Sequence, residues 1–274
     1  MRVALLQMTA GIDPAVNART LVDAVAEARS RGATMLFTPE MSGLIDRDRE
    51  RAARSITDEA SDAVLAAVRQ AAAEHELWVH LGSLAVRQKD GQLANRGFVI
   101  DDRGEVRARY DKLHLFDIDL PTGERWRESA AYAPGGAAVL ADTPAGMLGL
   151  SICYDLRFPA LYQALSGAGA TLLAVPSAFT RPTGSAHWHS LMRARAIECA
   201  AFVIAAAQTG LHEDGRETFG HSLVVDPWGE VLLDMGEAPG LAVVDLPTDV
   251  LADVRARLPV IAHRRIIPEV RVAR

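Results

Sequence analysis

Short β-type runs alternate with a longer helical pattern at the start of the chain, and this rhythm restricts the fold more than any other feature of the sequence. Residues 2–8 form an apolar strand-like run, 14–31 have helical spacing, and 33–38 are strand-like again. Asp13 followed by Pro14 is a typical helix start, and Gly32 stands where a helix would end. This order predicts a layered α/β fold.

The alternation continues along the chain. Helical spacing predicts helices at 58–74, 160–166 and 184–200, with strands at 77–86, 147–152, 171–175 and 202–208. Runs at 95–101 and 105–110 flank a turn signal at 102–104 and predict a hairpin. Short connections between 222–226, 230–234 and 241–246 predict antiparallel pairing, so the sheet should be mixed. The stretch 112–136 reads as a long irregular loop, a type that is often functional.

Length and composition fit one globular unit. The chain has 274 residues, of which 49% are hydrophobic and 23% charged, enough for a sizeable core and a water-facing surface. Since no linker or internal repeat stands out, we predict a single domain over residues 1–274.

Charge and hydropathy restrict the partners. The net charge is -6 and the arginines are scattered, which argues against nucleic acid. The longest apolar stretch, 199–207, has about half the length of a membrane span, and no secretory signal is visible. With only two cysteines, Cys153 and Cys199, a disulfide framework is excluded. We therefore expect a soluble, cytoplasmic protein without a membrane partner.

Three residues in different segments are candidates for chemistry. Cys153 follows an apolar run and precedes a tight polar turn, where a thiol can lie in a cleft beside backbone N–H groups. Glu40 ends an early strand, at the edge where open α/β sheets assemble their sites. Lys112 has apolar and aromatic neighbours. Each has an ordinary alternative, since free cysteines are usually buried and inert, a carboxylate can be a loop residue, and a lysine can extend its charge to solvent.

Together, the segments 37–40, 111–117 and 152–159 resemble the motifs of the nitrilase superfamily of carbon-nitrogen hydrolases, and the resemblance spans nearly the whole chain. Later segments, including 177–180, 193–198, 220–222 and 225–229, are similar to the Nit amidase branch, and within it to the Nit1-like deaminated glutathione amidases more than to the ω-amidases. One position departs from the pattern: Trp188 is followed by His189, where the family commonly has an acidic residue.

The resemblance implies an α-β-β-α sandwich of four layers with mixed sheets, paired into a homodimer through its helical layers. It implies that Cys153 is the nucleophile, Glu40 the general base and Lys112 the oxyanion stabiliser, with Glu128 as an additional active-site carboxylate. The expected reaction is hydrolysis of a small carboxylate-bearing amide to an acid and ammonia through a cysteine thioester. A backbone N–H from Tyr154 would be a second oxyanion donor.

The substrate-contacting residues are less defined. Arg157 matches an arginine that binds a substrate carboxylate in the carbamoylase branch, but an ion pair with Asp155 is an equal alternative. Phe179, Thr180 and Thr183 are candidates for the pocket wall, although they are also ordinary loop residues. Nitriles are disfavoured because Tyr154 and Asp155, rather than a Trp-Glu type context, follow the cysteine. An ω-amidase and an N-carbamoyl amino acid amidohydrolase remain alternatives.

Other classes have weaker support. No GxSxG, Walker or GxGxxG pattern occurs, so we predict neither a serine hydrolase of the α/β-hydrolase kind nor a nucleotide cofactor. His187 and His189 are the closest histidine pair, but positions i and i+2 on a helix point about 200° apart. We therefore predict no metal and no other cofactor. The non-enzymatic alternative is a catalytically silent scaffold of the same fold.

Overall fold

The computed structural model describes residues 1–119, 123 and 125–273. Its strands form two six-stranded sheets and two small hairpins. The first sheet has the order β16-β1-β2-β3-β4-β5, with β1 Arg2–Gln7, β2 Met35–Phe37, β3 Trp78–Arg87, β4 Leu93–Ile100, β5 Val106–Asp111 and β16 Gly240–Asp245. The second has the order β15-β14-β11-β10-β9-β8, with β8 Leu140–Thr143, β9 Gly146–Leu150, β10 Leu172–Ala174, β11 Phe202–Ala205, β14 Leu223–Val225 and β15 Val231–Asp234.

The remaining elements are the hairpins and helices. One hairpin pairs β6 Asp117–Asp119 with β7 Arg125–Arg127, and the other pairs β12 Thr209–Leu211 with β13 Glu217–Phe219. The α-helices are α1 Pro14–Ser30, α2 Arg49–Ser55, α3 Ala63–Glu74, α4 Pro159–Gly167, α5 Arg181–Cys199 and α6 Thr248–Arg257. Three short 3-10 helices are η1 Glu59–Ser61, η2 Glu128–Ala130 and η3 Cys153–Arg157.

Both large sheets are mixed, as predicted, and they share one pairing pattern. From β16 to β5 the neighbours pair antiparallel, parallel, parallel, antiparallel and antiparallel. Reading the second sheet from β8 to β15 gives the same order. Each sheet with its helices forms one half of the molecule. In each half, the chain segments that join the two pairs of parallel strands contain helices, as parallel pairing requires. The halves are therefore alike in topology, although no repeat is visible in the residues.

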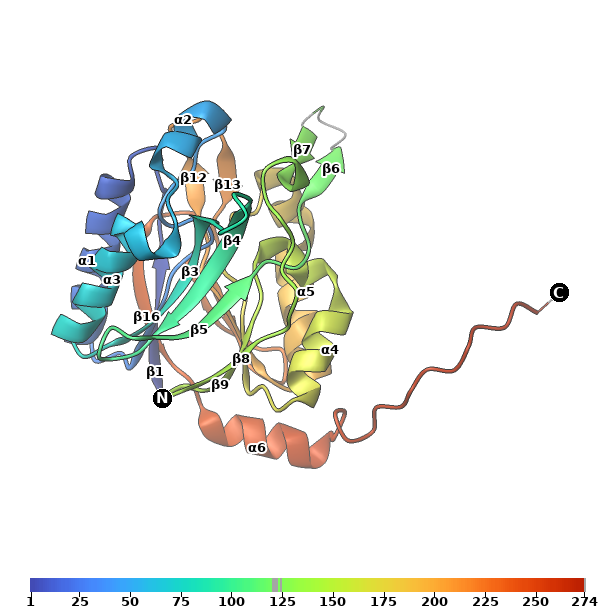
Figure 1. The fold of residues 1–274 in the computed structure, drawn as a ribbon. Coiled ribbons are helices and arrows are strands. Elements are labelled where there is room, and N and C mark those ends of the chain that lie inside the picture. The colour runs from blue at the N-terminus through green and yellow to red at the C-terminus, as the bar shows by residue number, and fades with distance from the viewer. Residues whose placement is uncertain (120–122, 124, 274) are drawn as a thin grey trace.

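The two sheets pack face to face between outer helices (Figure 1). Helices α1 and α3 cover the first sheet, and α4 and α5 cover the second. The layer between the sheets buries apolar residues from both, including Leu5 and Phe37 from the first and Leu148 and Leu172 from the second. The predicted four-layer α-β-β-α sandwich is thus confirmed, and its apolar layers supply the main driving force for folding.

Local capping explains where the helices begin. The Asp13 carboxylate accepts a hydrogen bond from the N–H of Ala15 at 2.8 Å, so α1 starts where the sequence predicts it. The predicted helix at 58–74 is broken, because Asp58 caps η1 and the Asp62 carboxylate caps α3 by accepting from Leu65 N at 2.8 Å. Helix α5 begins at Arg181 rather than at 184, since proline is tolerated in a first turn.

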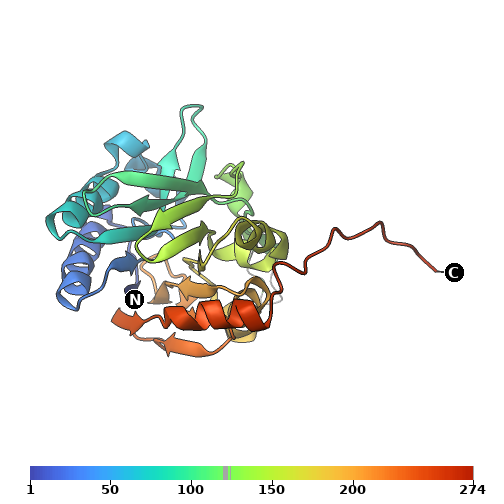
Figure 2. The same ribbon diagram turned by 90° about the horizontal axis from the view of Figure 1, so that it is seen from below.

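Some elements differ from the prediction. Helices α2 and α6, strand β8 and hairpin β12–β13 were not predicted. The stretch 112–136 is not wholly irregular, because it contains β6, β7 and η2, while residues 120–122 and 124, including Pro121, lie outside the described residues. Figure 2 shows α6 lying across one end of the molecule, with the C-terminal segment leading away from the body. Among the described residues, no helix has the length and apolarity to cross a membrane.

Candidate active site

Four of the predicted residues meet at one end of the sheets. Glu40 follows β2, Lys112 follows β5 directly, Cys153 begins η3 after β9, and Glu128 begins η2. All four line a cavity of about 410 Å³. The carboxyl ends of neighbouring strands deliver side chains to a common edge, which brings together residues that are far apart in the chain.

A glycine allows the strands to approach closely at this edge. A Cβ atom on Gly82, in β3, would collide with the backbone oxygens of Thr38 and Pro39 and lie 2.6 Å from Pro176. The loop that carries Glu40 therefore packs directly on β3, beside the segment after β10. Any larger residue at position 82 would displace Glu40.

Cys153 occupies a constrained turn. Its φ of +48° lies in the left-handed region, which is costly for a residue with a Cβ atom. Its backbone N–H donates to Pro176 O at 2.9 Å, and the preceding N–H of Ile152 donates to the Asp155 carboxylate at 2.9 Å. These bonds hold the turn, so that the thiol faces the cavity.

Lys112 is buried between two carboxylates. Its Nζ donates to Glu40 Oε1 at 2.8 Å and to Glu128 Oε2 at 2.9 Å, and only 2% of the lysine side chain is exposed. Glu40 Oε2 accepts from the N–H of Ala178 at 2.9 Å, and Glu128 Oε2 accepts from the N–H of Phe116 at 2.7 Å. Lys112 is therefore not a lysine that extends its charge to solvent, and both carboxylates have fixed orientations.

Asn95 completes this network and was missed by the sequence analysis. From β4, its Nδ2 donates to Glu40 Oε1 at 3.0 Å and to Glu128 Oε1 at 3.1 Å. The one signal in the sequence was a polar residue at the start of a strand-like run. Gln208 also supports Glu40, because its Nε2 donates to the glutamate backbone oxygen at 3.0 Å.

The charges of the site are set by burial and by each other. Burial alone would raise the pKa of Glu40, but the charge and hydrogen bond of Lys112, together with the Cys153 thiol, lower it. Burial would lower the pKa of Lys112, but Glu128 and Glu40 raise it well above its ordinary value. Burial and the neighbouring Glu40 raise the pKa of the Cys153 thiol, against the effect of Lys112. At neutral pH the site therefore contains a carboxylate, an ammonium and a neutral thiol.

Asp155 has partners other than Arg157. Its carboxylate accepts hydrogen bonds from Tyr110 Oη at 2.7 Å and from the N–H of His114 at 3.0 Å, in addition to Ile152 N. The Arg157 guanidinium instead lies over the rings of Tyr154 and Phe179, 6.0 and 5.5 Å from their centroids, and near His187. The ion pair between Arg157 and Asp155 considered from the sequence is therefore not formed.

The cavity wall includes several residues named from the sequence. Tyr154, Phe179, Thr180 and Thr183 line it, whereas the residues that line it do not include Arg157. Cys199 is fully buried, in agreement with a core role. The cavity wall also contains five arginines that the sequence analysis did not single out: Arg47, Arg49, Arg125, Arg127 and Arg216.

Two of these arginines lie close to the ring of Trp126. The guanidinium carbons of Arg47 and Arg216 lie 5.3 and 4.7 Å from its ring centroid, distances at which cations are attracted to the aromatic face. Within the described part of the chain, Arg216 Nε and Trp126 Nε1 are buried donors without a protein acceptor. These two N–H groups are suited to hydrogen bonds with an acceptor in the cavity.

Comparison with known proteins shows the family of the chain. A model of the carbon-nitrogen hydrolase family matches residues 2–256. The chain is 41% identical to the deaminated glutathione amidase of Bos taurus, over 96% of this chain and 81% of the bovine protein. It is 38% identical to the enzyme of the same name from Yersinia enterocolitica, over 97% of this chain and 93% of that protein.

Solved structures show the same fold. The NitFhit protein of C. elegans is 38% identical with a TM-score of 0.87, over 96% of this chain and 65% of that protein. An amidase from Nesterenkonia sp. AN1, with acrylamide added to its active-site cysteine, is 33% identical with a TM-score of 0.79, over 94% of this chain and 98% of the amidase. The chain belongs to the carbon-nitrogen hydrolase family and is a hydrolase of carbon-nitrogen bonds other than peptide bonds.

Proposed function

We propose that this enzyme hydrolyses the amide bond of a small carboxylate-bearing amide through a thioester on Cys153, and that deaminated glutathione is its substrate. The observation that carries the proposal is the arrangement of Glu40, Lys112 and Cys153 around one cavity. An unactivated amide requires a strong nucleophile, a site for negative charge on oxygen and a proton for the leaving nitrogen. The three side chains can supply all of them.

In the first half-reaction, Glu40 removes the proton from the Cys153 thiol as sulfur attacks the carbonyl carbon. Because the raised pKa keeps this thiol neutral, deprotonation accompanies attack. The C–S bond forms and the carbonyl electron pair moves to oxygen, where the Lys112 ammonium and the backbone N–H of Tyr154 stabilise it. The C–N bond then breaks, and Glu40 returns its proton to the departing nitrogen.

In the second half-reaction, a water molecule attacks the thioester carbonyl while Glu40, ionised again, accepts a proton from it. The new C–O bond forms, the C–S bond breaks, and the sulfur takes the proton back as the acid leaves. One carboxylate thus serves both steps. Glu128 and Asn95 act as positioning residues, since they hold Lys112 and Glu40 through hydrogen bonds at 2.9 and 3.0 Å.

The charge of the cavity wall favours an anionic substrate. Among the described residues of the wall, the five arginines and Lys112 outnumber the acidic residues, which are Glu40, Asp46 and Glu128. A cavity with an excess of positive charge attracts anions. We propose that Arg216 Nε and Trp126 Nε1, the buried donors without a protein acceptor among the described residues, bind a substrate carboxylate. Arg157 would then act through Tyr154 and Phe179 rather than on the substrate directly.

Relatives support the choice of acyl group. The bovine and Yersinia proteins are named deaminated glutathione amidases, and this chain covers most of their length. Hydrolysis of that substrate would release an amine, cysteinylglycine, whereas a simple ω-amide would release ammonia. An assay must therefore measure the acid product as well as the nitrogen product.

The test is a substrate panel containing deaminated glutathione, α-ketoglutaramate, glutamine analogues and an N-carbamoyl amino acid. We expect the highest kcat/KM for deaminated glutathione. A higher value for α-ketoglutaramate would assign the enzyme as an ω-amidase, and one for the carbamoyl compound would assign it as a carbamoylase. No turnover of any member by correctly folded protein would favour the scaffold alternative.

We also propose that the enzyme is a cytoplasmic homodimer of single-domain chains. Ile197 on α5 and the nearby Trp228 and Val231 are exposed apolar residues. They give the outer face of the second sheet and its helices a surface that a second copy could cover. The core between the two sheets supports one folding unit. Light scattering should give the dimer mass, and Ile197→Asp should shift it toward the monomer. A monomeric wild-type mass would contradict the dimer.

A further inference from the structure

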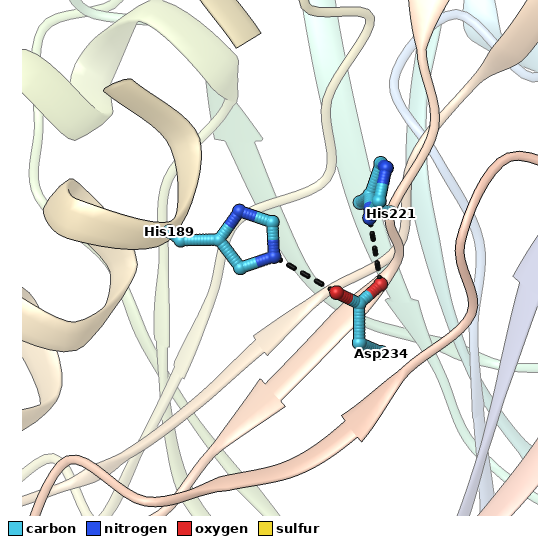
Figure 3. A group of neighbouring side chains, drawn as sticks. All are labelled: His189, His221 and Asp234. Atoms are coloured by element: carbon cyan, nitrogen blue, oxygen red, sulfur yellow. Dashed lines mark hydrogen bonds and ion pairs between the residues drawn. The ribbon is translucent and has the colours of Figure 1, made fainter. Parts of the chain in front are cut away.

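Figure 3 shows a second cluster of side chains, His189, His221 and Asp234, that can bind ligands. None of the three is among the residues that line the active-site cavity. His189 comes from α5, His221 from the segment between β13 and β14, and Asp234 from the end of β15. His189 Nε2 lies 2.8 Å from Asp234 Oδ2, and His221 Nδ1 lies 2.9 Å from Asp234 Oδ1. One ligand atom from each residue lies within 4.8 Å of the other two.

The backbone around this cluster is held in place. Trp188 Nε1, beside His189 on α5, donates to the backbone oxygen of His221 at 2.8 Å. The N–H of His221, whose φ is +56°, donates to Gly236 O at 2.7 Å, and Gly236 N donates to Asp234 Oδ1 at 2.9 Å. The ring of Phe219 stacks on His221 with centroids 4.5 Å apart. Three separate elements are thus connected before any ligand binds.

We propose that His189, His221 and Asp234 form a binding site for a divalent transition metal of the zinc class. Two imidazole nitrogens and one carboxylate oxygen are ligands that Zn²⁺ commonly takes, and a water molecule would complete four-coordination. In a tetrahedral zinc site with bonds of about 2.0–2.1 Å, neighbouring ligand atoms lie roughly 3.3 Å apart. Small side-chain rotations would bring the three groups to that spacing.

The proton balance is simple. The metal needs an unprotonated nitrogen from each imidazole, so each of the two protons shared with Asp234 moves to the other nitrogen of its own ring or to solvent. The carboxylate exchanges two hydrogen bonds for the metal. All three side chains are partly exposed, so an ion can reach them without opening the core.

The proposed metal site differs from the active-site cavity in its location and in the effect that we expect from binding. None of its three residues lines the cavity. Metal would connect α5 to the β14–β15 side of the second sheet, and α5 begins next to the cavity residue Thr180. Because a ligand that binds only the folded state stabilises it, the expected result is greater thermal stability rather than a new reaction.

The test is calorimetric titration with Zn²⁺ of protein without a histidine tag, in a Cys153→Ala background that removes the cavity thiol. We expect one ion per chain, a dissociation constant in the micromolar range, and a rise in Tm with zinc. His189→Gln and Asp234→Asn should each weaken binding at least tenfold, since loss of even an outer partner costs about 10–100-fold in metal affinity. The matched control His187→Gln, on the same helix, should bind zinc as the background protein does.

Two results would overturn the site. One is the absence of saturable binding below millimolar zinc, which would leave His189, Asp234 and His221 as a hydrogen-bonded group only. The other is unchanged binding in both His189→Gln and Asp234→Asn, which would put the ion elsewhere. A crystal soaked in zinc provides an independent readout, because anomalous density should lie between the three side chains. Amide hydrolysis by His189→Gln without zinc should equal that of the wild type.

Discussion

The ammonium of Lys112 lies 2.8 Å from the carboxylate of Glu40, and both side chains are almost fully buried. Breaking a buried ion pair leaves an uncompensated charge, so neither residue can be exchanged without consequences for the other. Here Glu128 and Asn95 contact the same pair. The positive charge that the proposed mechanism requires on Lys112 thus depends on two carboxylates, of which only Glu40 is proposed to move protons.

Glu128→Gln tests the positioning role. The neutral amide keeps the shape but removes the charge that contributes most to the raised pKa of Lys112. The lysine pKa should therefore fall, and the alkaline limit of kcat/KM should move toward neutral pH. We expect kcat to drop by about 10–100-fold, less than for loss of an oxyanion donor, which costs about 100–1000-fold. The exposed control Glu105→Gln should change neither kcat nor the alkaline limit of kcat/KM. An unshifted alkaline limit in Glu128→Gln would contradict a positioning role of Glu128 on Lys112.

Cys153 and Cys199 should differ in the rate at which iodoacetamide alkylates them. Cys153 lines the cavity, whereas Cys199 is fully buried, so iodoacetamide should modify Cys153 first. Because the thiol pKa of Cys153 is raised, its alkylation should still be accelerating above pH 9. Peptide mass spectrometry over a pH series measures both rates. Equal rates for the two cysteines would support the scaffold alternative.

Arg216→Gln should weaken binding of anionic substrates. Loss of a hydrogen bond to a charged group costs about 1.5–3 kcal/mol, so KM for a carboxylate-bearing amide should rise by roughly 10–100-fold. For a neutral amide such as propionamide the change should be small. Arg157→Gln serves as the comparison, because Arg157 is not among the residues lining the cavity. If Arg157→Gln had the larger effect on KM, the carboxylate site would belong to Arg157.

His80 should make folding stability depend on pH. It is buried in β3, and burial lowers its pKa to about 3. The unfolded chain takes up a proton on this residue below pH 6.5, so stability is complete above that pH and falls as the pH drops toward 3. Between pH 7 and pH 5 the loss should be about 2 kcal/mol. Urea unfolding of wild type and His80→Phe measures it, and an equal loss in both would exclude His80 as the source.

The sequence predicted those parts of the fold that have a strong local pattern. The predicted strands and the long helix α1 are present, because their apolar residues recur at the period of the element and Asp13 caps the helix. Helices α2 and α6 were missed for the opposite reason. Helix α2 has no buried residue and α6 has one, Val254, so neither has an apolar face that a periodic pattern could reveal.

The site residues predicted from the sequence, Glu128 among them, are those that match the motifs of the resembled family, and the residues missed are those that reach the site through packing between distant segments. Glu40, Lys112 and Cys153 come from strand ends. Asn95 reaches Glu40 from a position 55 residues away, and Arg216 reaches the cavity from the hairpin β12–β13. Similarly, the histidine nearest to His189 in the sequence is His187, on the same helix. The groups near it, His221 and Asp234, are neighbours only in the folded sheet.

The most direct test of the central claim is acid release from the preferred amide by Cys153→Ser, with Cys199→Ser as the matched control. Both variants replace one sulfur by oxygen in a buried thiol. The account predicts no detectable product with Cys153→Ser and a rate within twofold of the wild type with Cys199→Ser. Wild-type rates of acid release from Cys153→Ser would contradict a thioester on Cys153, and with it the proposed mechanism.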